Sequence, residues 1–220
     1  MRVEIIVPSS LNDITLEQYQ KFEKINTEDN ADSNFLLHKT VEIFCNLELK
    51  DIAKIKFSSV RSVIDDINKA FETKNELIPT FELNGITYGF ITNLDDMTLG
   101  EYIDLDENLG DWSSMHKAMR VLYRPIKFQK GDRYQIEEYD GLKDADIMKK
   151  MPLDVVMGAM VFFWNLNSEL LETTLNYLSR ELKEDKNTHL LHHLEKNGVG
   201  IKASMESLKE MLPSLTRLQD

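Results

Sequence analysis

The stretch that decides the fold is Phe81–Pro125, which reads FELNGITYGFITNLDDMTLGEYIDLDENLGDWSSMHKAMRVLYRP. Its Asn84-Gly85 pair is the dipeptide that best accepts the positive φ angles of a two-residue hairpin turn. Apolar and β-branched residues lie on both sides of this pair, as in half-buried strands. A β-hairpin is therefore predicted from Phe81 to Ile91.

Two predicted helices follow this hairpin. Thr98 can accept a hydrogen bond from a backbone N–H while the Glu101 side chain reaches back to residue 98, which is the reciprocal arrangement of a capping box. A second helix is predicted from about Asp111 to Tyr123. It should end there, because Pro125 disfavours the helical conformation of the residue before it.

The same helix start occurs earlier in the chain. Ile14-Thr15-Leu16-Glu17-Gln18-Tyr19 has the pattern of Met97-Thr98-Leu99-Gly100-Glu101-Tyr102, and Thr15 and Gln18 again form a capping box. The two stretches diverge after the tyrosine. This favours repeated use of one local motif over an internal duplication.

The flanking segments predict the fold class. A strand is predicted over Val3–Val7, and a second hairpin around Lys130-Gly131-Asp132. From Leu142 onward every strong signal is helical. We expect an α+β chain that is predominantly helical, with two β-hairpins, an N-terminal strand and a helical C-terminal part. A mixed α+β domain is predicted over residues 1–141 and a helical C-terminal region over residues 142–220.

The helical C-terminal part contains the most apolar segment. Leu153–Asn165 is apolar nearly all round, and Glu169–Leu182 is amphipathic. We predict that residues 152–182 form two packed helices and that Phe162 or Phe163 docks on a neighbouring chain. A two-helix hairpin on a single sheet would leave one side of the first helix in water.

Composition limits the classes of partner. The formal net charge of −12 argues against a nucleic-acid backbone or an anionic lipid surface as the main partner. Cys45 is the only cysteine, so an intrachain disulfide is impossible, and its place beside Phe44 in a predicted helix indicates a buried, inert thiol. The longest apolar run, Val155–Trp164, is far shorter than the roughly 20 residues of a membrane span. No membrane segment is expected.

The acidic stretch Asp104–Asp111 resembles a calcium loop only superficially. Such a loop starting at Asp104 needs glycine at its sixth position and glutamate at its twelfth, where this chain has Leu109 and Met115. We therefore predict an acidic loop between two helices.

The histidines near the C-terminus are the other candidate metal ligands. His189 and His193 are four residues apart, so they would share a helix face, with His192 and Glu195 beside them. The zincin pattern requires glutamate directly after the first histidine, where this chain has Leu190. No metal or other cofactor is expected, although a metal-dependent enzyme that uses His189, His192, His193 and acids such as Asp104 remains the alternative of another class.

No intact catalytic motif is present, so the remaining candidates are protein-interface residues. The sequence lacks a phosphate-binding GxxxxGK[ST] loop and a GxSxG nucleophile motif. Aromatic, methionine and arginine side chains are favoured at the centres of protein interfaces. The candidates of this kind are Trp112, Tyr123, Arg124, Phe162, Phe163 and Trp164.

Several of these segments resemble a known group of proteins. Ile14–Tyr19, Thr98–Leu105 and Met115–Ile126 look like small proteins encoded among the virion and assembly genes of tailed bacteriophages. The resemblance covers about residues 11–126 and rests on helix caps and helix faces. It implies no catalytic residues, and the helical stretch after Pro152 lies outside it.

The resemblance implies a non-catalytic structural protein that acts through protein–protein contacts in the tail or the head–tail connector. The alternative is a tail assembly chaperone that is not retained in the virion. The expected partners are other phage proteins, with a homo-oligomeric ring as one form of assembly and no direct contact with nucleic acid or membrane. The expected location is the virion, or the host cytoplasm during assembly. A host-directed binding protein made early in infection is a third interpretation, which the sequence does not separate from the first two.

Overall fold

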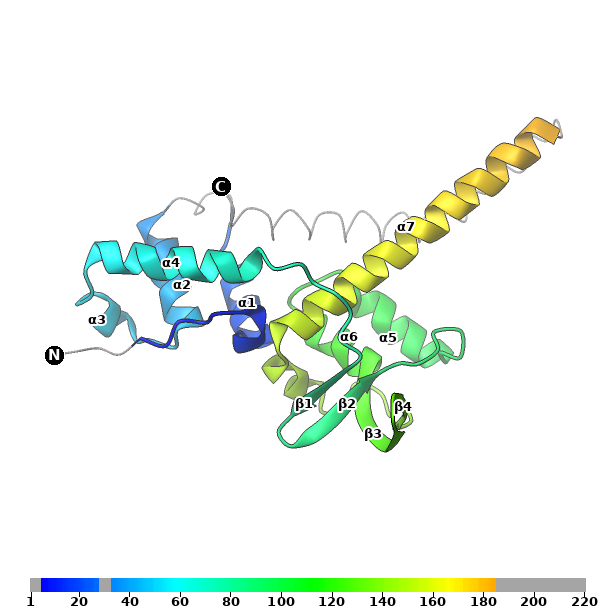
Figure 1. The fold of residues 1–220 in the computed structure, drawn as a ribbon, viewed down its shortest axis with the longest axis horizontal. Helices are drawn as coiled ribbons and strands as arrows, with labels where there is room; N and C mark the ends of the chain where they lie inside the picture. Colours follow the sequence, from blue (N-terminus) through cyan, green and yellow to red (C-terminus); the bar gives the residue numbers. More distant parts are fainter. Residues whose placement is uncertain (1–4, 28–32, 185–220) are drawn as a thin grey trace.

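The computed structural model describes residues 5–27 and 33–184 (Figure 1). It confirms a helix-dominated α+β fold. In chain order the elements are η1 (Leu11–Asp13), α1 (Leu16–Glu23), α2 (Asn34–Phe44), α3 (Leu49–Ile52), α4 (Phe57–Phe71), β1 (Thr80–Leu83), β2 (Ile86–Phe90), α5 (Leu99–Leu109), α6 (Met115–Leu122), β3 (Tyr123–Lys130), β4 (Arg133–Ile136), η3 (Ala145–Lys150) and α7 (Leu153–Glu184).

Both predicted hairpins are confirmed, and they join in one sheet. The sheet has the order β1-β2-β3-β4, and every neighbouring pair is antiparallel. Asn84 and Gly85 adopt φ angles of 53° and 77° at the first turn, and Gly131 adopts 60° at the second. Helices α5 and α6 are inserted between β2 and β3, so the two hairpins meet only after the chain has passed through both helices.

Both predicted capping boxes are also confirmed. At the start of α1, the Gln18 N–H donates to Thr15 Oγ1 at 3.3 Å, and the Thr15 N–H donates to Gln18 Oε1 at 2.9 Å. At the start of α5, the Glu101 N–H donates to Thr98 Oγ1 at 3.3 Å, and the Thr98 N–H donates to Glu101 Oε2 at 2.6 Å. Local sequence alone fixes both helix starts.

One buried cluster connects the helices with the sheet. It contains Tyr19 of α1, Leu122 of α6, Phe90 of β2, Met148 of η3 and Leu153 of α7. Buried residues on both sides of the predicted division at 141/142 therefore belong to the same core. The division into two regions remains a prediction.

The predicted N-terminal strand is wrong for residues 5–7. These residues pair with no strand of the sheet, and the rest of the predicted strand lies outside the described residues. Ile5 and Val7 pack against the core while Ile6 is 81% exposed. The β-branched residues that predicted a strand thus pack on the core from one side and pair with no strand of the sheet.

The predicted acidic loop at Asp104–Asp111 is helical over most of its length. Helix α5 continues to Leu109, and Gly110 follows as its C-cap residue. Within the helix, the Asn108 side chain donates to the Asp104 carbonyl oxygen at 2.7 Å. No glycine or proline interrupts the stretch before Gly110, so the acidic residues lie on the helix surface.

The two packed helices predicted over residues 152–182 are one continuous helix. Helix α7 has 32 residues, which corresponds to about 48 Å at 1.5 Å per residue. No glycine or proline occurs between Asn165 and Glu169 to end the first predicted helix. Figure 1 shows the first part of α7 against the body and the second part extending beyond it.

Candidate protein interface on helix α5

Helix α5 carries exposed apolar side chains on one face. Leu99 is 75% exposed, Tyr102 is 59% exposed and Ile103 is 44% exposed. Residues three and four positions apart lie together on a helix surface, so these three side chains form one patch. Asp106 continues the same face and Glu107 flanks it, and both are exposed. We call Leu99, Tyr102, Ile103, Asp106 and Glu107 the α5 face.

The opposite side of α5 is anchored in the body. Glu101, Leu105 and Asn108 are buried. The carboxylate of Glu101 accepts from the guanidinium of Arg124, at the start of β3, at 2.8 Å, and the side chains are 5% and 7% exposed. The same carboxylate accepts from the Thr98 hydroxyl at 2.7 Å. One carboxylate thus joins the helix cap, the helix body and the sheet.

A second polar contact supports α5 from the segment after β4. Tyr139 donates its hydroxyl to Asp104 Oδ2 at 2.5 Å, and its ring lies 5.9 Å from the Arg124 guanidinium carbon. Burial, with the bond to Asp104, raises the pKa of Tyr139 well above its ordinary value. The phenol is therefore protonated at neutral pH and acts as a donor. These contacts fix which side of α5 faces outward.

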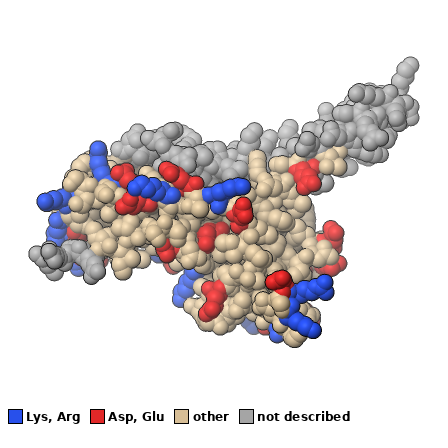
Figure 2. Space-filling view, in the orientation of Figure 1, with Lys and Arg blue, Asp and Glu red and all other residues tan. Residues whose placement is uncertain are grey.

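The sequence around the α5 face contains acids and no lysine or arginine. No lysine or arginine occurs between Lys74 and Lys117. Asp95 and Asp96, in the loop before α5, are exposed like Asp106 and Glu107. Figure 2 shows acidic side chains at the right-hand edge of the body, where Figure 1 places this loop. The apolar patch thus lies in negatively charged surroundings.

Comparison with α1 shows that the exposure of Leu99 and Tyr102 depends on where α5 lies in the fold and not on the local sequence of the capped helix start. Leu16 and Tyr19 occupy the places of Leu99 and Tyr102 after the same type of cap, and both are 0% exposed. The Tyr19 ring packs edge-on against Trp112 at 4.5 Å between centroids. The body covers the apolar face of α1, whereas the apolar residues of the α5 face stay exposed among the residues that the structure describes.

Four of the residues predicted as interface anchors are buried within the chain. Trp112 is 6% exposed, Tyr123 is 0%, Arg124 is 6% and Phe163 is 7%. Tyr123 donates to the Ile78 carbonyl at 2.8 Å, and Arg124 pairs with Glu101. In this structure these four side chains are core residues that offer little surface to a partner. Their ring packing, hydrogen bonds and ion pairs are made with other residues of the same chain.

The other two predicted anchors, Phe162 and Trp164, are only partly buried. Phe162 packs edge-on against Phe90 at 5.5 Å and lines an open cleft of about 330 Å³ between α7 and the segment after β2. Leu77, Ile91 and Leu94 supply much of the apolar lining. This cleft is a second surface that could hold an apolar side chain of a partner.

The candidate chemical groups do not form a metal or thiol site among residues 5–27 and 33–184. No group of three or more potential metal ligands occurs there. His189, His192 and His193 lie outside the described residues, so the metal prediction for them is not addressed. Cys45 is buried, and burial raises the pKa of its thiol to about 11. It is therefore a protonated core residue at neutral pH.

The sequence did not reveal the α5 face in advance. Apolar residues at helical spacing predict a core-facing side, and only the tertiary structure shows that Leu99, Tyr102 and Ile103 are left uncovered. The signal that the sequence does carry is the absence of lysine and arginine around these three residues.

None of the described helices has both the length and the apolar character of a membrane span. Comparison of the chain with protein families, curated proteins and solved structures gave no match.

Proposed function

We propose that this is a non-catalytic protein that acts through protein–protein contacts, as a structural part of the tail or the head–tail connector of a tailed bacteriophage. The observation that carries the binding role is the α5 face, where Leu99 and Tyr102 are exposed although the equivalent residues of α1 are buried. Single exposed apolar residues are common, but a contiguous patch that rigid contacts hold outward is typical of a binding surface.

The phage context of the proposal comes from the resemblance of Ile14–Tyr19, Thr98–Leu105 and Met115–Ile126 to tailed-phage virion and assembly proteins. Two of these segments include the capped starts of α1 and α5. A tail assembly chaperone that leaves before the particle is complete is the alternative within the same class. Both versions require binding of other phage proteins.

The experiment is mass spectrometry of purified, nuclease-treated particles, together with affinity capture from infected cells at the assembly stage. A stoichiometric signal in particles supports the structural role. Absence from particles, with capture of a phage tail protein, selects the chaperone. Failure to find the chain in particles or with any phage protein overturns the proposal.

A matched pair of variants assigns the binding to the α5 face. Tyr102→Ser removes a 59% exposed side chain from the face, and Phe57→Ser removes a 51% exposed side chain from α4. Tyr102→Ser is expected to reduce incorporation or capture, while Phe57→Ser leaves both unchanged. Equal effects of the two variants would contradict a specific role of the α5 face.

A further inference from the structure

We infer that the α5 face of one copy of this chain receives the β3–β4 hairpin of a second copy. The inference names the occupant of the α5 face and so rests on the proposal that this face binds protein. Two exposed surfaces of the same chain match in polarity and are opposite in charge.

The β3–β4 hairpin presents an exposed aromatic ring among cations. Phe128 is 63% exposed. Lys127, Lys130 and Arg133 are all exposed around it, and Asp132 in the turn is the one acid among residues 127–133. In Figure 2 basic side chains gather at the lower right of the body, where Figure 1 places this hairpin. The hairpin end is thus both apolar and positively charged.

Within residues 5–27 and 33–184, the charges of the two surfaces form no ion pairs. Among the residues that the structure describes, no acid lies within 4.0 Å of the charged nitrogens of Lys127, Lys130 or Arg133. Over the same residues, Asp106 and Glu107 of the α5 face pair with no cation. Many other charged residues of the surface do form pairs, as Glu17 does with Lys21 at 2.9 Å.

The chemistry of the two surfaces is complementary. The Phe128 ring can pack between Leu99, Tyr102 and Ile103, because aromatic and aliphatic side chains at an interface centre exclude water together. The hairpin cations then lie near Asp106, Glu107 and the exposed acids before α5. Such electrostatic complementarity selects the partner and fixes how the two chains meet. A second copy is favoured over an unrelated protein because this chain itself carries both halves of the match.

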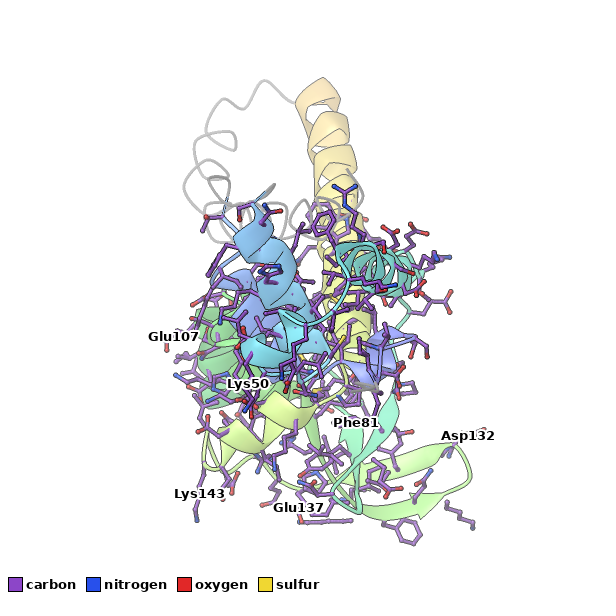
Figure 3. All side chains as sticks on the ribbon, turned by 90° about the vertical axis from the view of Figure 1, so that its left-hand side faces the viewer. Lys50, Phe81, Glu107, Asp132, Glu137 and Lys143 are labelled. Atoms are coloured by element: carbon purple, nitrogen blue, oxygen red, sulfur yellow. The ribbon has the colours of Figure 1, made fainter. Side chains whose placement is uncertain are left out.

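The two surfaces are on opposite sides of the molecule. Figure 3 labels Glu107, near the end of α5, at the left of the view and Asp132, in the hairpin turn, at the right. A chain cannot therefore satisfy its own α5 face with its own hairpin. The contact between copies is head-to-tail, and repetition of such a contact produces a closed ring or an open filament.

The experiment uses the purified full-length chain and measures its molar mass by light scattering at low and high salt. Wild type is expected to self-associate with increasing protein concentration and to dissociate at high salt, because salt screens exposed charges. Two variants reverse one surface each: Lys130→Glu with Arg133→Glu on the hairpin, and Asp106→Lys with Glu107→Lys on the α5 face. Each is expected to weaken self-association by roughly tenfold or more.

Mixing the two variants is the decisive step. The reversed hairpin of one variant is complementary to the reversed α5 face of the other, and their unchanged surfaces also match each other. The mixture is therefore expected to regain the assembly that each variant lacks alone. The control variant, Lys21→Glu with Lys74→Glu, reverses two exposed lysines that belong to neither surface and is expected to assemble like wild type.

The inference is overturned if wild type remains a monomer up to about 100 µM, a concentration that would reveal even weak association. It is also overturned if the folded reversal variants assemble like wild type, or if their mixture stays monomeric. Far-UV circular dichroism identifies a variant that fails to fold, and in that case the single substitutions Arg133→Glu and Asp106→Lys replace the double ones. Because only this chain is present, failure here leaves the particle and capture experiments to decide the proposed function separately.

Discussion

Glu101 and Arg124 form an ion pair of 2.8 Å that is almost completely removed from solvent. The pair connects the first turn of α5 to the first residues of β3, and Glu101 also caps α5 through Thr98. A buried charge that loses its partner is strongly destabilising, even where the pair as a whole contributes little. The attachment of the α5 face to the body should therefore be sensitive to either partner.

Replacement of Arg124 by methionine is expected to reduce the free energy of unfolding by about 3–5 kcal/mol, because the Glu101 carboxylate stays buried without its cation. Adding Glu101→Gln to Arg124→Met should recover part of this loss, since the amide oxygen can still accept from Thr98. Urea unfolding measures both values. Lys21→Met, in an exposed pair with Glu17, is the control and should have little effect. A loss no larger than that of the control would contradict a structural role for the buried pair.

Two helical glycines are expected to respond to alanine with opposite signs. Alanine at Gly100 of α5 meets nothing within 4 Å, so Gly100→Ala should stabilise the protein by about 0.5–1 kcal/mol. At Gly158 of α7 an added Cβ would overlap the carbonyl oxygen of Glu76 and lie 2.9 Å from its carbonyl carbon. Gly158→Ala should therefore destabilise the protein by about 1–3 kcal/mol.

Urea unfolding of the two glycine variants provides the comparison. Backbone atoms of Glu76 and Leu77 would have to move to admit the methyl group at position 158. If both variants are stabilised to the same extent, the connection from α4 to β1 does not pack against α7 as the structure shows.

The sequence predicted those parts of the fold that depend on local chemistry. The Asn84-Gly85 turn and the caps at Thr15 and Thr98 need only neighbouring residues, and all three are confirmed. Contacts between distant residues are not predicted by local chemistry. The sequence predicts Tyr123 and Arg124 as interface anchors, and the structure buries them against Ile78 and Glu101, which are far from them in sequence.

The exposure of the α5 face also depends on distant contacts, which the sequence pattern does not predict. The pattern of Leu99, Tyr102 and Ile103 is that of a buried helix face, and the pattern of Leu16 and Tyr19 is no different. Which of the two faces is covered depends on how the helices pack, and sequence periodicity has no information on that. The continuity of α7 was missed for a related reason, because a polar stretch without glycine or proline does not have to end a helix.

The two equivalent tyrosines are expected to differ in their effect on stability. Tyr19→Ala removes a fully buried ring that packs against Trp112, and should cost about 3–5 kcal/mol of unfolding free energy. Tyr102→Ala removes a 59% exposed ring and should change stability by less than about 0.5 kcal/mol. Thermal and urea unfolding of the two variants test this. A large loss for Tyr102→Ala would mean that the chain itself covers the α5 face.

Stability should decrease at mildly acidic pH because of His116. Its ring is buried and lies 3.2 Å from Gln20 Nε2. Burial, with the nearby Lys149 ammonium, lowers the pKa of His116 below its ordinary value of 6.5, although Asp146 opposes this shift. The unfolded chain therefore binds a proton more readily than the folded chain. The neutral His116 ring therefore contributes fully to the free energy of unfolding above pH 6.5, and this contribution is lost as the pH falls from 6.5 through the lower pKa of the folded protein.

His116→Gln removes the titrating group and is the matched variant for this effect. Between about pH 7.5 and pH 5 the unfolding free energy of this variant should decrease less than that of wild type, because glutamine does not bind a proton in this range. Titrating carboxylates affect both proteins alike, so the difference between the two pH profiles reports the contribution of His116. Urea midpoints at several pH values provide the measurement. Identical pH profiles would show that His116 titrates normally in the folded protein.

The absence of any residue between α6 and β3 has a geometrical consequence. Leu122 ends the helix and Tyr123 begins the strand, and the next residue, Arg124, is held by Glu101 of α5. The hairpin that projects from β3 and the helix that carries the α5 face are therefore fixed at one angle. In a head-to-tail assembly this angle, together with the orientation of the hairpin on the α5 face, sets the rotation from each subunit to the next and so the number of copies that complete a circle. Loosening the Glu101–Arg124 contact would then change the number of subunits, or open the circle into a helix, before it weakens any single contact between neighbours.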